Sequence, residues 1–408
     1  MLPFLYFFVM KRGVLNLLFL LISLQACAQI ATHKDIFEND IKVGAAQFEL
    51  YLPDIQNKRV AICANHTSMV GNTHLVDTLL ALKINVVKVF SPEHGFRGEA
   101  EAGKHVNSTK DDRTGLPLVS LYGKTKKPSV QDMQGVDVVL FDIQDVGARF
   151  YTYISTMHYV MEAAAENNVD VIVLDRPNPN GYFVDGPVLD MAHTSFVGMH
   201  PVPIVHGMTV GEYARMINGE SWLANGVKCN LKVVRVFNYN HTLRYQLPIA
   251  PSPNLPNMAS IYLYPSLCLF EGTTLSMGRG TDKPFQVIGH PDLKIGDYQF
   301  TPRSIPGKAA NPPHLDKVCK GFDLSSMATT VLKNKNEVNL FWLIDTYNNF
   351  PDKKAYFNNF FTKLAGNTTL RQQIESGMSE AEIRKSWETD LQKFKTIRKK
   401  YLLYTDFE

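Results

Sequence analysis

The chain has 408 residues, with 42 Lys and Arg against 39 Asp and Glu and a formal net charge of +3. Hydrophobic residues make up 45% of it, which excludes wholesale disorder, and the near balance of charge argues against a nucleic-acid partner. The length predicts two domains, or one large α/β domain with an appendage, and either can bury a full core.

Residues 1–27 have the pattern of a secretory signal. Lys11 and Arg12 precede an apolar run from Gly13 to Leu24, and small residues follow at the cleavage point. Cys27 closes a Leu-Gln-Ala-Cys sequence that resembles a bacterial lipoprotein box, with ordinary cleavage nearby as the alternative. We therefore expect an exported protein, either periplasmic or anchored to the membrane as a lipoprotein, with no transmembrane segment in the mature chain.

Four short runs rich in Val and Ile each end in polar residues. They are residues 59–67, 85–93, 136–145 and 169–178. Continuous apolar content is typical of strands buried on both faces of a parallel sheet. Helical periodicity in 73–83 and 151–167, with a long loop over 96–130, gives the order β-α-β, loop, β-α-β. This order predicts a Rossmann-like, doubly wound and mostly parallel α/β sheet.

A third unit is expected to extend this sheet. It consists of the segment 203–207, a helix over 209–223 and a strand over 228–236, and Thr209 and Glu212 have the spacing of a capping box. The Rossmann-like domain is therefore assigned to residues 40–284.

From about Phe285 the chain mixes short strands with helices, which predicts a smaller C-terminal α+β domain over 285–408. Its helices are expected near 337–349, 353–364 and 379–399. The last residues, 401–404, are predicted to dock against the rest of the protein.

In an open parallel sheet, ligands bind at the carboxyl ends of the strands, where the βα loops converge. All four predicted strands end in polar side chains. The candidates are His66, Glu93, His94, Asp142, Gln144, Asp145, Arg149, Asp175, Arg176 and Asn178. A single Asp or Asn after a strand is often only a turn former or a helix cap, but four clusters together favour a functional site.

Glu93 is the strongest candidate for a catalytic residue. Pro92 restricts its approach, and Gly95 permits a tight turn that presents the carboxyl to a cleft. A carboxyl in that place can act as a general acid. The alternative is that Glu93 pairs with Arg97 or Arg149 and only fixes the loop.

Later loops add further candidates for binding a substrate. His206 precedes the capping box, Asn254 lies in a proline-rich loop, and Glu271 is followed by small polar residues. Arg279 stands between two glycines and is suited to bind a carboxylate through two parallel hydrogen bonds. Its alternative role is to pair with Glu271 or Asp282 and hold its own loop.

Several motifs are absent or incomplete, so neither a cofactor nor a metal is expected. Residues 98–104 have P-loop spacing, but His105 replaces the required Ser or Thr. Neither a G-x-S-x-G elbow nor a G-x-G-x-x-G after the first strand is present. The cysteines beyond the signal lack metal-ligand spacing, and Cys63 and Cys268 are predicted to be buried thiols.

Seven strings of the chain resemble one family. They are SPEHGFRG at 91–98, DIQDVGARFYTY at 142–153, DRPNP at 175–179, HGMT at 206–209, PSPN at 251–254, EGT at 271–273 and GRGT at 278–281. The family is the exo-β-N-acetylmuramidases of the NamZ type, formerly a domain of unknown function, and the resemblance extends from about 42 to 404.

The resemblance implies an enzyme that releases N-acetylmuramic acid from the non-reducing end of peptidoglycan glycans or muropeptides, in cell-wall turnover and recycling. It also implies a cleft between the Rossmann-like and C-terminal domains, and a catalytic glutamate at Glu93.

Glycoside hydrolysis needs a carboxylic acid and a second group, either a carboxylate or the acetamido oxygen of the substrate. Asp142 and Asp145 are candidates for the second carboxylate or for orienting the acetamido group. Arg149, Arg176 or Arg279 could clamp the lactyl carboxylate of muramic acid. Tyr151 could stack on a sugar ring or serve as a hydrogen-bonded anchor.

Two rival functions come from other classes. A metal-dependent hydrolase would use His66, His94, Asp142 and Asp175, since strand-end His and Asp are ordinary metal ligands. A non-catalytic lipoprotein would bind cell-wall glycans and leave them intact.

Overall fold

The computed structural model describes residues 41–93, 95–97, 109–123, 125–328 and 335–408. Val43–Glu408 forms one compact unit. The predicted signal with Cys27, the candidate His94 and the P-loop-like stretch lie outside the described residues. None of the helices within the described ranges is both long and apolar enough to cross a bilayer.

The main sheet has the strand order β5-β6-β4-β1-β7-β8-β9. Its strands are β1 (Val60–Ala64), β4 (Val86–Ser91), β5 (Thr109–Lys110), β6 (Pro117–Ser120), β7 (Val138–Asp142), β8 (Asp170–Leu174) and β9 (Leu231–Val234). Every pair is parallel except the short edge strand β5, which runs antiparallel to β6. The order reverses direction at β1 and β7, which confirms the predicted doubly wound sheet.

The four predicted apolar runs contain β1, β4, β7 and β8, and every residue of β1 and β7 is buried. The prediction of a plain loop over 96–130 was wrong, because β5 and β6 lie within it. β6 has only four residues and begins at Pro117, too short a run to be recognised as a strand. The segment 203–207 contributes only isolated bridges from Val205 to Ala148 and Asp185.

The helices of the described residues are α2 (Leu52–Ile55), α3 (Leu75–Ala81), α4 (Val130–Met133), α5 (Tyr153–Glu166), α6 (Val210–Gly219), α7 (Met258–Leu267), α8 (Ser325–Met327), α10 (Phe341–Asn348), α11 (Lys353–Tyr356), α12 (Phe361–Ala365), α13 (Thr369–Glu375) and α14 (Glu380–Lys399). Thr209 and Glu212 form the predicted capping box at the start of α6.

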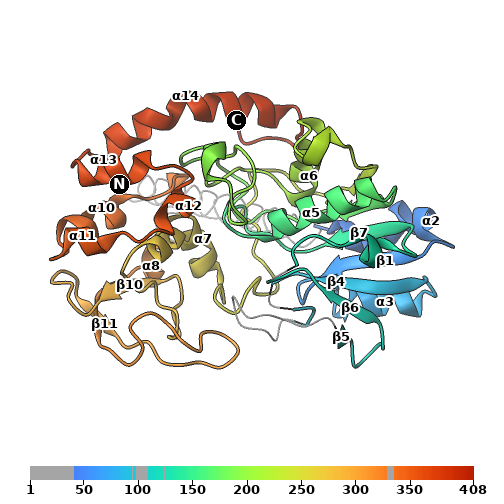
Figure 1. Ribbon diagram of the computed structural model, residues 1–408, viewed down its shortest axis with the longest axis horizontal. Coiled ribbons are helices and arrows are strands. Elements are labelled where there is room, and N and C mark those ends of the chain that lie inside the picture. The colour runs from blue at the N-terminus through green and yellow to red at the C-terminus, as the bar shows by residue number, and fades with distance from the viewer. Residues whose placement is uncertain (1–40, 94, 98–108, 124, 329–334) are drawn as a thin grey trace, which may run out of the picture. The chain divides into compact units, whose positions relative to one another are not determined.

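The sheet has a core on each face because successive side chains of a strand point to opposite sides. In β1, Ala61 and Cys63 belong to the core that includes α5 and α6. Val60 and Ile62 belong to the core that includes α3. Figure 1 shows α5 and α3 on either side of these strands. The result is a three-layer α/β arrangement with the strand ends left free to carry loops.

The C-terminal region contains a smaller antiparallel sheet with helices, as predicted. Its order is β10-β12-β11, with β10 (Val287–His290), β11 (Tyr298–Phe300) and β12 (Cys319–Asp323). The largest core cluster includes residues of both predicted domains, so they share one interior. The boundary at 284/285 stays a prediction.

The chain end docks as the sequence predicts. α14 runs toward α6 (Figure 1), and beyond it Tyr404 Oη donates to Asp175 Oδ2 at 2.6 Å. Arg398 donates to the carbonyl of Gly207 and pairs with Asp406. These contacts join the last helix to the Rossmann-like sheet.

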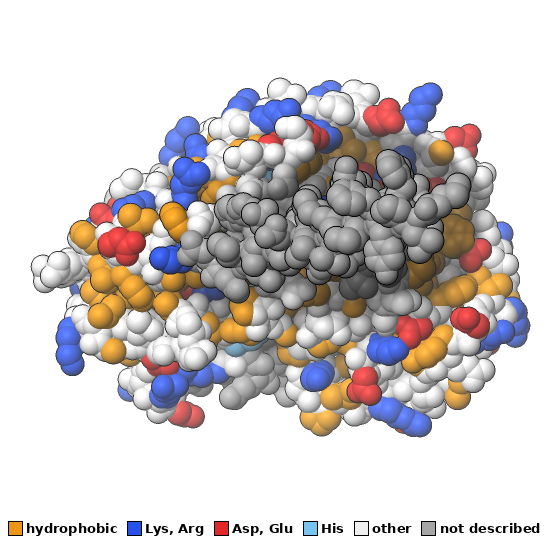
Figure 2. All heavy atoms as spheres, turned by 180° about the vertical axis from the view of Figure 1, so that it is seen from behind, with side chains coloured by type: hydrophobic (Ala, Val, Ile, Leu, Met, Phe, Trp, Pro, Cys, Tyr) orange, Lys and Arg blue, Asp and Glu red, His pale blue; other side chains and the backbone are white. Residues whose placement is uncertain are grey.

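The four described cysteines are free and buried, which confirms the prediction for Cys63 and Cys268. On the face shown in Figure 2, basic and acidic side chains of the described surface are mixed. Such a mixture produces no strong field of one sign.

Candidate active site

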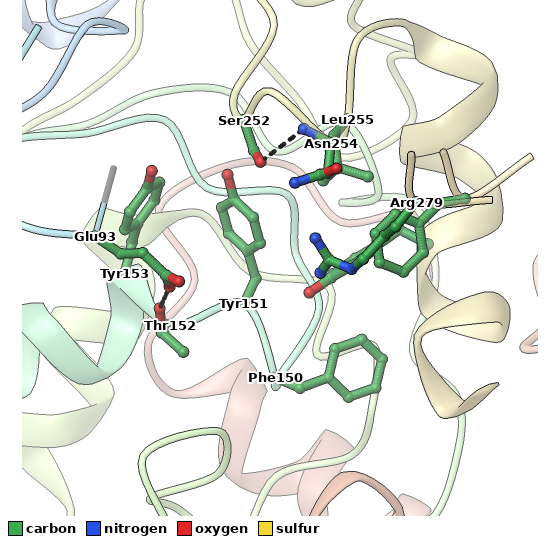
Figure 3. A pocket seen from close by; sticks show the side chains of 11 residues that line it. Glu93, Phe150, Tyr151, Thr152, Tyr153, Ser252, Asn254, Leu255 and Arg279 are labelled. Atoms are coloured by element: carbon green, nitrogen blue, oxygen red, sulfur yellow. Dashed lines mark hydrogen bonds between the residues drawn. The ribbon is translucent and has the colours of Figure 1, made fainter. Parts of the chain in front are cut away.

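A small pocket lies where the end of β4, the start of α5 and the segments 252–255 and 264–285 meet (Figure 3). Its cavity volume is about 70 Å³. The lining residues are Glu93, Phe150, Tyr151, Thr152, Tyr153, Ser252, Asn254, Leu255, Tyr264, Arg279 and Phe285. The pocket therefore combines a carboxylate, a guanidinium and an aromatic wall.

Glu93 reaches this pocket from a tight turn two residues beyond β4. The amide of Gly95 donates to the carbonyl of Pro92 at 3.1 Å, and Gly95 has a φ of +76°, in the left-handed region that glycine adopts without strain. This is the turn that the sequence predicts. Thr152 Oγ1 donates to Glu93 Oε2 at 3.1 Å, so the carboxylate is held at the start of α5.

The alternative partners proposed for Glu93 are engaged elsewhere. Arg97 Nη2 lies 2.8 Å from Asp111 Oδ2, and Arg149 donates to backbone carbonyls. Two tyrosines are close to Glu93 instead: burial raises the pKa of Tyr122 and of Tyr153, and the negative charge of Glu93 adds to both shifts. Their hydroxyls stay protonated at neutral pH and can donate hydrogen bonds.

Arg279 lies across the pocket from Glu93, with Tyr151 between them in the view of Figure 3. Its Nε and Nη2 both donate to Oε1 of Glu271, at 3.0 and 2.5 Å. This is the pairing that the sequence left open as the alternative. About a quarter of the side chain, 23%, is exposed, and within the described part of the chain its Nη1 donates no hydrogen bond. Arg279 therefore lines the pocket while it is paired with Glu271.

Tyr151 and Asn254 hold the rim of the pocket. Tyr151 Oη donates to the carbonyl of Pro251 at 2.8 Å, and its ring packs edge to face against Tyr264. Asn254 Nδ2 donates to the carbonyl of Lys308 at 3.2 Å. Tyr151 therefore acts as an anchor, the second of the two roles that the sequence left open, while its ring still lines the cavity.

Asp142 and Arg176 form a buried ion pair away from the pocket. Arg176 Nε lies 2.6 Å from Asp142 Oδ1, and Nη2 lies 2.9 Å from Oδ2. Each group is bound by the other, and neither lines the pocket. The roles of Asp142 as second catalytic group and of Arg176 as clamp stay predictions.

Arg149 is buried and donates to four backbone carbonyls at 2.8 Å. Their residues are Pro187, Val202, Leu364 and Ala365. It joins the Rossmann-like region to α12 and does not line the pocket, so its role as a clamp stays a prediction.

Asp175 and His206 are likewise part of the interior. Asp175 accepts from Thr209 Oγ1, the amide of Gly211 and Tyr404 Oη, and thus caps α6. His206 is fully buried, and burial lowers its pKa to about 3. Neither side chain lines the pocket.

The side chains of Gln144 and Asn178 also donate hydrogen bonds to backbone carbonyls. Gln144 Nε2 donates to the carbonyl of Pro177 at 2.7 Å, and Asn178 Nδ2 donates to that of Met208 at 2.8 Å. Their prediction as substrate ligands has no support in this geometry, because neither contributes to the lining.

Asp145 is buried and does not line the pocket. Its Oδ2 accepts from the amide of Gly147 at 2.6 Å, and burial raises its pKa to about 7.

His66 belongs to a neighbouring hollow of about 270 Å³ that Arg97 and Arg113 also line. Its Nε2 lies 2.8 Å from the carbonyl of Ala250. Across the described ranges, no three His, Cys, Asp or Glu side chains converge as metal ligands. Asp142 and Asp175, two of the proposed metal ligands, are bound within the protein.

Some lining residues have no signal in the sequence. Leu255, Tyr264 and Phe285 are buried like many other residues of the chain, and only the fold brings them to one wall. Thr152 could have been noticed as a hydroxyl at the predicted start of a helix, although nothing there points to Glu93.

A carboxylate and a partly exposed guanidinium that line a small aromatic-walled pocket suit a hydrolase for a small acidic or sugar substrate. The family model described as "Exo-beta-N-acetylmuramidase NamZ, N-terminal" matches residues 60–259, and the corresponding C-terminal model matches 262–404. The chain belongs to this family. Glu93, Tyr151 and Asn254 lie in the first part, and Tyr264 and Arg279 in the second, so the pocket is built from both.

Individual relatives agree with this placement. The peptidoglycan β-N-acetylmuramidase NamZ of Bacillus subtilis (strain 168) is 40% identical over 384 residues, which cover 87% of this chain and 89% of that protein. Two crystal structures of DUF1343 family proteins from Bacteroides fragilis NCTC 9343 are similar, with TM-scores of 0.84 and 0.77 at 51% and 29% identity. Each similarity covers 90% of this chain and 99% of the other.

Proposed function

We propose that this protein is an exo-acting glycoside hydrolase that releases N-acetylmuramic acid from the non-reducing end of peptidoglycan glycan fragments, in cell-wall turnover and recycling. Family membership supports the reaction class. The observation that carries the proposal is the pocket itself, in which Glu93 and Arg279 lie across from each other and aromatic side chains form much of the lining.

Glu93 acts as the general acid in this proposal. It transfers a proton to the glycosidic oxygen as the bond from that oxygen to C1 of muramic acid breaks. Water then supplies a hydroxyl group to C1, and its remaining proton restores the acid. Because Asp142 is bound by Arg176, the acetamido oxygen of the substrate is favoured as the group that stabilises C1.

Arg279 recognises the lactyl carboxylate that distinguishes muramic acid from glucosamine. It is the member of the three candidate arginines that lines the pocket, and Glu271 fixes its orientation. The small size of the cavity favours binding of a chain end over binding of an internal segment. Time courses on defined glycans should therefore show monosaccharide from the outset, and early internal fragments would contradict exo action.

The decisive experiment is to incubate the protein with a disaccharide of N-acetylmuramic acid linked to N-acetylglucosamine and to detect free N-acetylmuramic acid. Glu93→Gln serves as the matched control. Loss of the activity with a chelator would favour the metal-dependent hydrolase, and tight binding without cleavage would favour the glycan-binding lipoprotein.

We propose in addition that the protein is exported to the periplasm, free or anchored through Cys27. The support is the secretory pattern of residues 1–27, together with a substrate class that is found in the cell wall. Fractionation of cells that produce the wild type and Cys27→Ala would test this, because loss of the cysteine should release a lipoprotein from the membrane fraction.

A further inference from the structure

Thr152 occupies the N-cap position of α5 but does not cap the helix. Its backbone has φ −77° and ψ −2°, and its side chain makes no capping hydrogen bond. At α4, α6 and α14 the N-cap residues Ser129, Thr209 and Ser379 have extended backbones, and each hydroxyl accepts from the third helical amide. Threonine at an N-cap ordinarily stabilises its helix in this second way. Thr152 therefore does not stabilise the start of α5 by a capping hydrogen bond.

The hydroxyl of Thr152 is directed at Glu93 instead. Figure 3 shows the two side chains joined in the pocket, where Oγ1 donates to Oε2 at 3.1 Å. An uncapped helix start is not by itself a sign of function, since the exposed Thr368 also leaves α13 uncapped. What distinguishes Thr152 is that its hydroxyl meets a carboxylate in the pocket.

The backbone of Thr152 is held firmly enough to orient another side chain. Its carbonyl accepts from the amide of Thr156 at 3.0 Å at the start of the helix, and the preceding Tyr151 is anchored to Pro251. Glu93, in contrast, projects from a turn and has three rotatable side-chain bonds to restrict. A hydrogen bond to Oε2 therefore restricts the carboxyl to fewer arrangements.

We infer that Thr152 is a positioning residue for Glu93. This inference rests on the proposed function, in which Glu93 is the general acid. Misplacement of a catalytic group by about 1 Å can lower the rate by two powers of ten, so one hydrogen bond that fixes the carboxyl has a measurable effect on turnover.

Thr152→Val removes the hydroxyl and keeps the shape of the side chain. We expect kcat to fall by about tenfold, the effect of one hydrogen bond, with KM within about twofold of the wild type. Thr152→Ser restores the donor and should keep kcat within about threefold. Ser155→Ala is the matched control, because the hydroxyl of Ser155 donates to the carbonyl of Phe196, so its removal should leave kcat unchanged.

A double-variant cycle separates this role from others. In a Glu93→Gln background, Thr152→Val should have little further effect, because the residue acts through Glu93. An equal further loss there, a raised KM with unchanged kcat, or failure of Thr152→Ser to restore turnover would overturn the inference. If Thr152→Val lowers thermal stability, Thr152→Ser still tests the inference because it keeps the hydroxyl donor. The double-variant cycle also tests it, because a purely structural loss would recur in the Glu93→Gln background. If Glu93→Gln retains full turnover, the assignment of Glu93 as the general acid is wrong. If Glu93→Gln is inactive and Thr152→Val has wild-type turnover, only the positioning role of Thr152 is wrong.

Discussion

Glu93 lies two residues beyond β4 and Asp142 is the last residue of β7, so both carboxylates stand at the same edge of one sheet. Asp142 is fully buried, and both of its oxygens are bound by Arg176. Glu93 lines a cavity and faces an arginine that Glu271 binds from the other side.

The difference shows that polar side chains at the end of a strand can either pair inside the protein or line a cavity. Where the chain supplies an internal partner for each polar atom, the cluster stabilises the fold, as for Asp142 and Asp175. Where the cluster opens on a cavity, its groups remain available to a ligand. Four predictions test this division.

The largest effect is expected at Glu93. Glu93→Gln removes the proton donor with little change in shape, so kcat should fall by roughly two to four powers of ten while the melting temperature stays close to that of the wild type. Kinetics on the muramic disaccharide, together with thermal melts, measure both. Turnover near the wild-type level would end the assignment of Glu93 as the acid.

Asp142→Asn should behave in the opposite way. It leaves the Arg176 guanidinium buried without its counter-charge, which typically costs about 3–5 kcal/mol of unfolding free energy. Urea denaturation measures this loss, and activity per folded molecule should be largely retained. A stable but inactive Asp142→Asn would restore Asp142 to the catalytic machinery.

Arg279→Met should change specificity more than stability. A charge-assisted hydrogen bond to the lactyl carboxylate contributes about 1.5–3 kcal/mol, which corresponds to a factor of about ten to a hundred. The ratio of kcat/KM for muramic over glucosamine glycosides should fall by that factor. An unchanged ratio with lower activity throughout would mean that Arg279, paired with Glu271, only holds its loop.

The smallest effect concerns Asp145 and pH. Burial raises its pKa from the ordinary 3.8 to about 7, so the folded protein holds a proton that the unfolded chain loses. The stability that this carboxyl contributes is complete below about pH 4 and is lost as the pH rises through 7. Asp145→Asn should therefore reduce the fall in unfolding free energy between pH 4 and 7. Part of the fall in unfolding free energy should remain in the variant, because burial also raises the pKa of Asp175, to about 6. A pH profile of the variant identical to that of the wild type would contradict the buried, protonated state of Asp145.

Much of the architecture follows from local properties of the chain. Runs of buried β-branched residues identify β1, β4, β7 and β8, the Thr209 capping box marks the start of α6, and Gly95 permits the turn that carries Glu93. Such features depend on residues only a few positions apart, so the sequence displays them directly. β6 was missed because four residues are too few to show a pattern.

The division between pocket and interior was decided only by tertiary structure. Asp142 meets Arg176 across 34 positions and Asp175 meets Tyr404 across 229, and no local pattern states that these partners will meet. The sequence therefore determined that polar groups gather at one edge of the sheet, Glu93 among them. Which of them face a substrate depends on long-range packing, because the partners of each carboxylate come from distant parts of the chain, such as Thr152 for Glu93 and Arg176 for Asp142.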